Sequence, residues 1–205
     1  MKEERRQFFE RIDGDQYRDY ILSRCSKDYE KVKSSLERLM DNRFMFDSPW
    51  DMEPCSKIHQ IQSMVWNQVF EDDPEWAYML NRQEYLLQFM IGYLVEGDKG
   101  YIQKCKFFLF DWIEQVREFS PQSLMTRTLD TGIRSFTWLK LLLLLLKFDL
   151  LEEQELEKIL VSLEKQIDFM KSHYRAKYTL SNWGILQTIP MLAIYHFFSD
   201  KMDLE

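Results

Sequence analysis

The chain has 205 residues, of which 45% are hydrophobic and 30% charged, as in folded globular proteins and unlike disordered ones. Only 6 Gly and 5 Pro interrupt it, whereas 15 Phe, 10 Tyr and 6 Trp supply large apolar side chains, so long helices are favoured over a sheet-rich fold. The net charge of −7 argues against a general nucleic-acid-binding surface, because binding a polyanion needs clustered basic residues.

Several further classes of protein are excluded by short patterns. Cys25, Cys55 and Cys105 are far apart and form no CxxC pair, which excludes a thiolate zinc cluster and a disulfide-rich scaffold. The three histidines lack metal-ligand spacing, so we expect no metal and no cofactor. No apolar stretch follows the charged first residues, and the apolar run 139–146 is too short to span a membrane. We therefore expect a cytoplasmic protein without membrane contact.

The first part of the chain divides at about residue 41. Residues 1–41 show helical patterns, with apolar residues three and four positions apart between Tyr29 and Met40. From Asn42 to Val69 the period is lost, and we expect an ordered loop rich in aromatic residues. The predicted organisation is a group of N-terminal helices, 1–41, followed by a helical domain, 42–205. A single continuous domain, 1–205, is the alternative.

Five helices are predicted in the second part. The segments are 74–94 with a stop at Gly97, 101–119, a helix from about 131 through the leucine run, 152–174, and 181–198 with a kink at Pro190. Short connections make neighbouring helices antiparallel. The third and fifth helices are apolar nearly all round and the fourth is amphipathic, which suggests inner and outer layers. We predict an all-α fold, an incomplete α/α toroid of antiparallel helices, with a helical bundle as the alternative.

Carboxylates gather around the start of the predicted helix at residue 74. Acidic residues at a helix start are stabilised by its positive end, which is the structural interpretation. The chemical interpretation is a glycosidase acid/base pair, which needs a second carboxylate across a cleft, and Asp130 is a candidate. The cluster comprises Glu71, Asp72, Asp73 and Glu75.

Polar and indole side chains also occur in three apolar helical segments. Each must belong to an internal network or face a ligand, since buried polar groups need partners. Arg134 can pair with Asp130, and Ser181 or Asn182 can cap a helix. Arginine binds carboxylate or sulfate and indole stacks on sugar rings, so an acidic sugar polymer is the ligand that suits them. The candidate residues are Asn81, Arg82, Arg134, Trp138, Asn182, Trp183 and Gln187.

These segments carry a family resemblance. Residues 73–82, 127–134 with Trp138, and 180–187 resemble, in order and separation, the N-terminal region of heparinase II/III-type polysaccharide lyases. The resemblance covers most of the chain from about Phe44 onward. It implies a helical toroid, normally followed by more helices and a β-sandwich domain. It also implies cleavage of uronate-containing glycans, of the heparan, hyaluronan or chondroitin type, by β-elimination.

The resemblance assigns roles to single residues. Asn182 matches the asparagine that the family places against the uronate carboxylate, and Trp183 stands where many relatives have histidine. The other candidates are expected to bind substrate. The family's catalytic tyrosine and histidine lie further along, so we expect this chain to be a fragment that binds acidic oligosaccharides without turnover. Unpaired apolar surface near 191–198 should make it self-associate or leave it only marginally stable. A non-catalytic glycan-binding domain and an α/α-toroid glycoside hydrolase are the alternatives.

Overall fold

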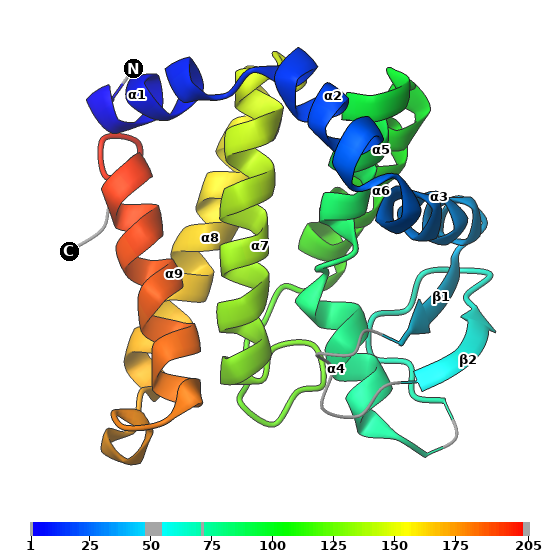
Figure 1. The fold of residues 1–205 in the computed structure, drawn as a ribbon. Coiled ribbons are helices and arrows are strands. Elements are labelled where there is room, and N and C mark those ends of the chain that lie inside the picture. Colours follow the sequence, from blue (N-terminus) through cyan, green and yellow to red (C-terminus); the bar gives the residue numbers. More distant parts are fainter. Residues whose placement is uncertain (1, 48–54, 71, 203–205) are drawn as a thin grey trace.

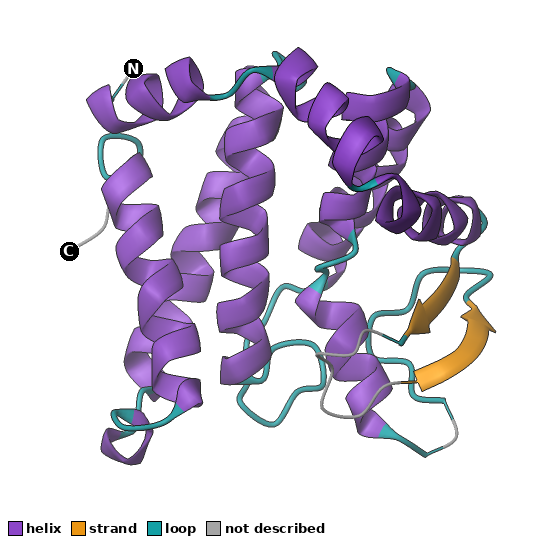
Figure 2. Cartoon of the chain, viewed as in Figure 1, coloured by secondary structure: helices purple, strands orange, loops and turns teal. Residues whose placement is uncertain are grey.

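Residues 2–47, 55–70 and 72–202 are described by a computed structural model in which helices predominate (Figures 1 and 2). The predicted all-α class is confirmed, with one small sheet added. The helices are α1 (Glu3–Arg11), α2 (Gly14–Arg24), α3 (Ser26–Met40), α4 (Pro74–Arg82), α5 (Leu86–Glu96), α6 (Lys99–Gln115), α7 (Thr128–Lys147), α8 (Glu153–His173), the short 3₁₀ helix η1 (Ala176–Tyr178) and α9 (Asn182–Phe198).

The centre of the molecule is α7, which contacts α4 and α5 on one side and α8 and α9 on the other (Figure 1). Its leucine run supplies much of the core: Leu142 and Leu145 are buried, while Leu146 is half-buried. The two helices α7 and α9 approach closely at Gly132, where an added Cβ would lie 2.3 Å from the carbonyl oxygen of Leu186 in α9. Only glycine lets the two helices pack at this distance.

The amphipathic helix α8 begins with reciprocal hydrogen bonds. The Glu152 carboxylate accepts a bond from the backbone of Glu155, whose carboxylate accepts one from the backbone of Glu152. Helix α9, by contrast, lies at the edge of the molecule and exposes apolar side chains, with Leu192 64% and Tyr195 54% exposed. The predicted apolar surface near residues 191–198 is therefore present, although Phe198 itself is buried.

A single predicted helix from residue 74 to 94 is wrong, because the structure divides it into α4 and α5. The break is at Gln83, whose backbone has the left-handed φ of 56°. Its side-chain oxygen accepts a 2.7 Å hydrogen bond from Trp138 Nε1 in α7. No glycine or proline marks this break in the sequence. The break coincides instead with a contact to a residue 55 positions away, which local sequence patterns do not reveal. The predicted start is correct, with Pro74 in the first turn and Asp73 capping it.

The segment expected to be an irregular loop contains a two-stranded antiparallel sheet. Strand β1 (Arg43–Phe46) pairs with β2 (Cys55–Gln60), and Phe44 lies opposite His59. Only the Phe44 ring is fully buried, packed against Trp76 and Phe108, so the strands lack a regular alternation of apolar and polar residues. The predicted ordered loop also includes residues 48–54, which lie outside the described residues.

The two ends of the described chain meet. Helix α1 lies against the C-terminal end of α9 (Figure 1). The Arg5 guanidinium, 2% exposed, binds both Asp200 carboxylate oxygens at 2.8 and 2.6 Å and the carbonyl oxygen of Phe197. The ammonium of Lys2 donates to the carbonyls of Tyr195 and His196. Basic side chains thus satisfy the last carbonyls of α9, whose helix dipole favours positive charge there.

Helices α4, α7 and α9 all begin at the same end of the molecule, the lower end in Figure 1. Among the described residues, no helix combines the length and the apolar composition needed to cross a membrane.

Candidate functional site

A groove of about 1270 Å³ separates α3 and β1 on one side from α7 and α9 on the other, with α4 and α5 between them. Arg82 and Asn182, both predicted from the sequence, lie in its lining. Charges of both signs line the groove, so it holds no surplus of positive charge. The cationic lining residues are Lys31, Arg38 and Arg82, and the acidic ones are Glu30, Asp47 and Glu84.

Asn182 is the first residue of α9 and its side chain is exposed. Its amide makes no hydrogen bond to any residue that the structure describes. Ser181 occupies the cap position, but its hydroxyl accepts no hydrogen bond from the helix backbone and instead donates to the Tyr178 carbonyl at 2.9 Å. Asn182 is therefore not a helix cap, and its amide is available to a ligand in the groove.

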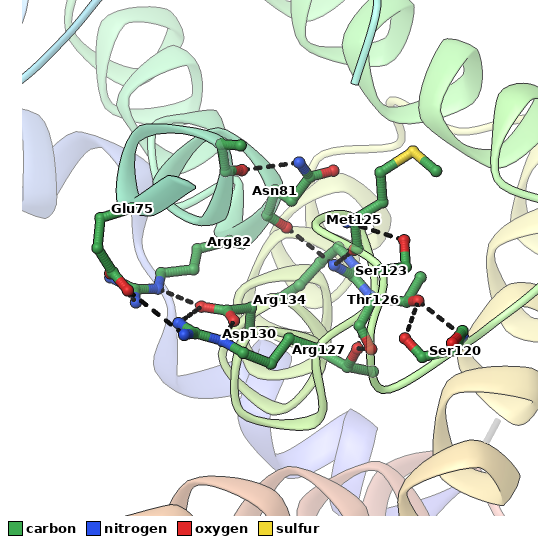
Figure 3. A network of polar contacts seen from close by, with 12 residues as sticks. Glu75, Asn81, Arg82, Ser120, Ser123, Met125, Thr126, Arg127, Asp130 and Arg134 are labelled. Atoms are coloured by element: carbon green, nitrogen blue, oxygen red, sulfur yellow. Dashed lines mark hydrogen bonds and ion pairs between the residues drawn. The ribbon is translucent and has the colours of Figure 1, made fainter. Parts of the chain in front are cut away.

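Beside the groove, two arginines and two carboxylates form a closed cluster, which we call the charge quartet: Glu75, Arg82, Arg127 and Asp130 (Figure 3). Arg82 Nε donates to Asp130 at 2.7 Å, and its Nη2 lies 3.6 Å from Glu75. Arg127 binds the same carboxylates, Asp130 through Nε and Glu75 through Nη1 at 3.3 Å. Each acid bridges two arginines, so the charges balance.

The quartet is stabilised by mutual charge interactions. Burial lowers the pKa of Arg127, but its hydrogen bond and charge interaction with Asp130 more than compensate, and the pKa lies above its ordinary value. The Asp130 side chain is fully buried. Removing one member would leave a buried charge without its partner, which is costly. The quartet therefore holds both ends of α4, through Glu75 and Arg82, against the start of α7.

The acid/base hypothesis finds no support in this geometry. Glu75 and Asp130 are both bound to the same arginines and do not face each other across the groove. Asp73 accepts the backbone N–H of Glu75 as a helix cap. Asp72 is exposed, with a left-handed φ of 59°. Glu71 lies outside the described residues.

Arg134 is fully buried and bonded on every nitrogen. Its Nη1 donates to the carbonyls of Asn81 and Met125 (Figure 3). Its Nε donates to Gln166 at 3.0 Å, and Nη2 donates to the Thr131 hydroxyl. Burial lowers the pKa of Arg134 to about 9, an effect that nearby Asp130 opposes, so the guanidinium remains charged at neutral pH. Arg134 therefore makes these bonds in place of the ion pair with Asp130 that the sequence suggested.

Three more predicted residues share the interior with Arg134. Asn81 donates to the carbonyls of Trp66 and Ala77 and accepts from Trp112 Nε1 at 2.8 Å. Trp138 holds the α4–α5 break, as described above, and buried Gln187 donates to the Trp183 carbonyl. Of the two roles considered for Asn81, Arg134, Trp138 and Gln187, the internal network is the one that this arrangement supports.

Trp183 is half-buried and belongs to a row of rings and cations. It stacks on Tyr178 at a centroid distance of 5.3 Å, and the Arg127 guanidinium lies 5.6 Å from its ring. The same guanidinium lies 3.4 Å from the centroid of Tyr78. Arg127 and Tyr78 are site residues that were not predicted from the sequence. The spacing of Arg127 three residues before Asp130, on one helix turn, was the available signal.

Metal ligation has no candidate among the described residues, where no group of three histidine, cysteine or acidic side chains comes together. The fold and the site define an all-helical domain whose groove presents an unpartnered amide beside ordered arginines and half-exposed aromatic rings. The family model described as heparinase II/III N-terminus matches residues 16–200, and the chain belongs to this family. No significant match was found among curated proteins or among solved structures.

Proposed function

We propose that this domain binds a uronate-containing glycan in the groove and acts as the N-terminal part of a polysaccharide lyase that works by β-elimination. The observation that carries the proposal is the position of Asn182, which the family resemblance assigns to the substrate carboxylate. Its amide is exposed, has no partner among the described residues and lines the groove next to α7. Family membership supports a lyase-related domain.

The role assigned to Asn182 is to stabilise negative charge on the uronate carboxylate by hydrogen bonding. A base removes the C5 proton of the uronate, the electron pair forms the C4–C5 double bond, and the bond from C4 to the leaving O4 oxygen breaks. O4 takes up a proton from an acid. During this step negative charge spreads onto the carboxylate, so an amide donor already in place binds the transition state more strongly than the ground state.

The opposite wall can orient the rest of the chain of sugars. Arg38 of α3 lines the groove, and its guanidinium donates to Ser34 at 3.0 Å while pairing with no acidic residue in the described part of the chain. It can therefore bind a carboxylate or sulfate of a neighbouring sugar in a bidentate way. Arg82 is paired with Glu75 and Asp130. It therefore shapes the wall of the groove and orients a fixed dipole there, and adds little net positive charge.

Calorimetric titration tests the binding step. A glucuronate-containing octasaccharide should bind the chain, and the same octasaccharide with its carboxylates reduced to alcohols should bind much more weakly. Arg38→Ala should weaken binding, whereas Lys158→Ala, an exposed change on α8 outside the groove lining, should not. Equal binding of the acidic and reduced sugars would contradict the proposal.

The elimination step is tested with the polypeptide that the complete gene encodes. It should convert heparan, hyaluronan or chondroitin fragments to products that absorb as 4,5-unsaturated uronates. Binding without any such absorbance would favour the non-catalytic glycan-binding alternative, and products that have gained water would favour a hydrolase. We also propose a cytoplasmic location, which the three free thiols of Cys25, Cys55 and Cys105 support.

A further inference from the structure

A row of cations and aromatic rings crosses the helix-start end of the molecule, and we call it the cation–aromatic ladder. Its members are Lys177, Tyr178, Trp183, Arg127 and Tyr78, from η1, α9, the start of α7 and α4. The Lys177 ammonium lies 5.3 Å from the Tyr178 ring, Tyr178 stacks on Trp183 with an angle of 30° between their planes, and Arg127 lies between Trp183 and Tyr78.

Backbone packing holds the ladder in place. A Cβ at Gly184 would lie 2.2 Å from the Tyr178 carbonyl oxygen, so glycine at this position allows η1 to lie directly against α9. Ser181 adds a hydrogen bond to the same carbonyl. The quartet fixes Arg127 at the other end. The rings are thus presented in a fixed geometry, while Tyr78, Tyr178 and Trp183 remain partly exposed.

The ladder adjoins the groove through a single residue. Asn182 lines the groove, and the next residue along α9, Trp183, belongs to the ladder. A sugar chain whose carboxylate is bound by Asn182 can therefore continue over the first turn of α9 onto the rings. The indole and phenol faces are apolar surfaces of the kind that pack on the C–H face of a pyranose.

The segment around η1 carries the net positive charge that the groove lining lacks. Residues 171–178 contain Lys171, Arg175 and Lys177 and no acidic residue, in a chain whose net charge is −7. Arg175 and Lys177 are exposed and form no ion pair with any described residue. Since the groove lining balances its own charges, this segment is the local positive surplus that an anionic sugar chain would meet.

We propose that the ladder is a second sugar subsite, in which Tyr178 and Trp183 stack on a pyranose ring and Lys177 with Arg175 binds its carboxylate or sulfate. This inference rests on the proposed glycan binding in the groove. It predicts that affinity depends on the length of the sugar chain. An oligosaccharide long enough to reach from Asn182 to the rings should bind more tightly than a disaccharide.

Calorimetry with a glucuronate disaccharide and a glucuronate octasaccharide tests the subsite. Tyr178→Leu and Trp183→Leu, which keep an apolar side chain but lose the flat ring, should weaken octasaccharide binding by about 3–10-fold. Lys177→Ala, at an exposed position, should weaken it by about threefold at low salt, with a smaller effect in high salt. Disaccharide affinity should stay unchanged in Tyr178→Leu and Lys177→Ala, and the exposed change Lys158→Ala should alter the binding of neither ligand.

Two results would overturn the inference in distinguishable ways. If the wild-type chain binds neither acidic sugar, the proposed function fails and the subsite fails with it. If the octasaccharide binds equally well to the wild type, Lys177→Ala and Tyr178→Leu, only the subsite is wrong and glycan binding in the groove stands. Circular dichroism confirms that each variant is folded, and Lys177→Ala, on the surface, does not depend on core packing.

Discussion

Replacing Gly132 with alanine separates α7 from α9. The new Cβ would lie 2.3 Å from the carbonyl oxygen of Leu186 and 3.2 Å from the Cα of Gln187, and both atoms belong to the backbone of α9. No side-chain rotation can relieve such a contact. Ordinary van der Waals contact starts near 3.4 Å, so α9 must move by about 1 Å or the two helices must remain strained.

The expected cost is the balance of two effects. Alanine is the better helix former by about 1 kcal/mol. Overpacking a well-packed contact costs about 1–3 kcal/mol and sometimes more. Because the clash is with backbone atoms, the upper end of that cost applies, and we expect a net loss of about 2 kcal/mol in the free energy of unfolding and a Tm lower by about 4–8 °C. Because Asn182 and Leu186 both line the groove, the displacement should also weaken binding of the acidic octasaccharide.

Urea unfolding and thermal melting measure the effect, with Gly100→Ala as the matched control. At Gly100 the nearest atom to an added Cβ is a carboxylate oxygen of Asp98, 3.1 Å away, so this side chain needs to shift by only a few tenths of an ångström and can keep its capping bond to the Gly100 N–H. The control should be unchanged or slightly more stable. If Gly132→Ala is as stable as Gly100→Ala and binds the sugar equally well, the close approach does not position α9.

Four further outcomes are expected. Arg134→Met should lower the free energy of unfolding in urea by about 3 kcal/mol or more, since it leaves several buried acceptors without donors. Asn182→Ala should leave the melting temperature unchanged but, in the complete enzyme, reduce kcat by about 10²–10³ with little effect on KM; normal turnover would remove it from catalysis. The Arg5 hydrogen bond lowers the pKa of Asp200, so its contribution to stability is present above about pH 4 and is lost as pH falls through the folded pKa; Asp200→Asn should flatten that part of the pH–stability curve. Leu192→Lys should reduce concentration-dependent self-association in light scattering, because this side chain is 64% exposed on α9.

The long helices were predictable because their apolar residues recur with the helical period. The sequence places α8 and α9 within one or two residues of their observed bounds, and a pattern over some twenty residues tolerates local exceptions. The division between α4 and α5 was not predictable. At Gln83 a hydrogen bond from Trp138, 55 residues away, accompanies the left-handed backbone, and local propensity carries no trace of it.

The candidate site was predictable in composition but not in pairing. Arg127 and Arg134 both flank Asp130 on the same helix, and spacing alone allows either to bind it. The structure selects Arg127, together with Arg82 from another helix, because Arg134 is drawn into the interior, where its guanidinium lies 4.1 Å from the Trp112 ring and bonds to Gln166. Tertiary neighbours decide which polar residue stays near the surface.

The contact between α1 and α9 constrains the order in which the chain folds. Arg5 and Asp200 are 195 positions apart, and α1 is a nine-residue helix rich in charge, too short to be stable by itself. A ribosome adding about 5–20 residues per second needs roughly 10–40 s to make the partner of Arg5 after Arg5 has been made. Through that interval α1 remains without its docking site, open to chaperones and proteases. Helix α1 is therefore made before α9 but is ordered only after α9 is in place.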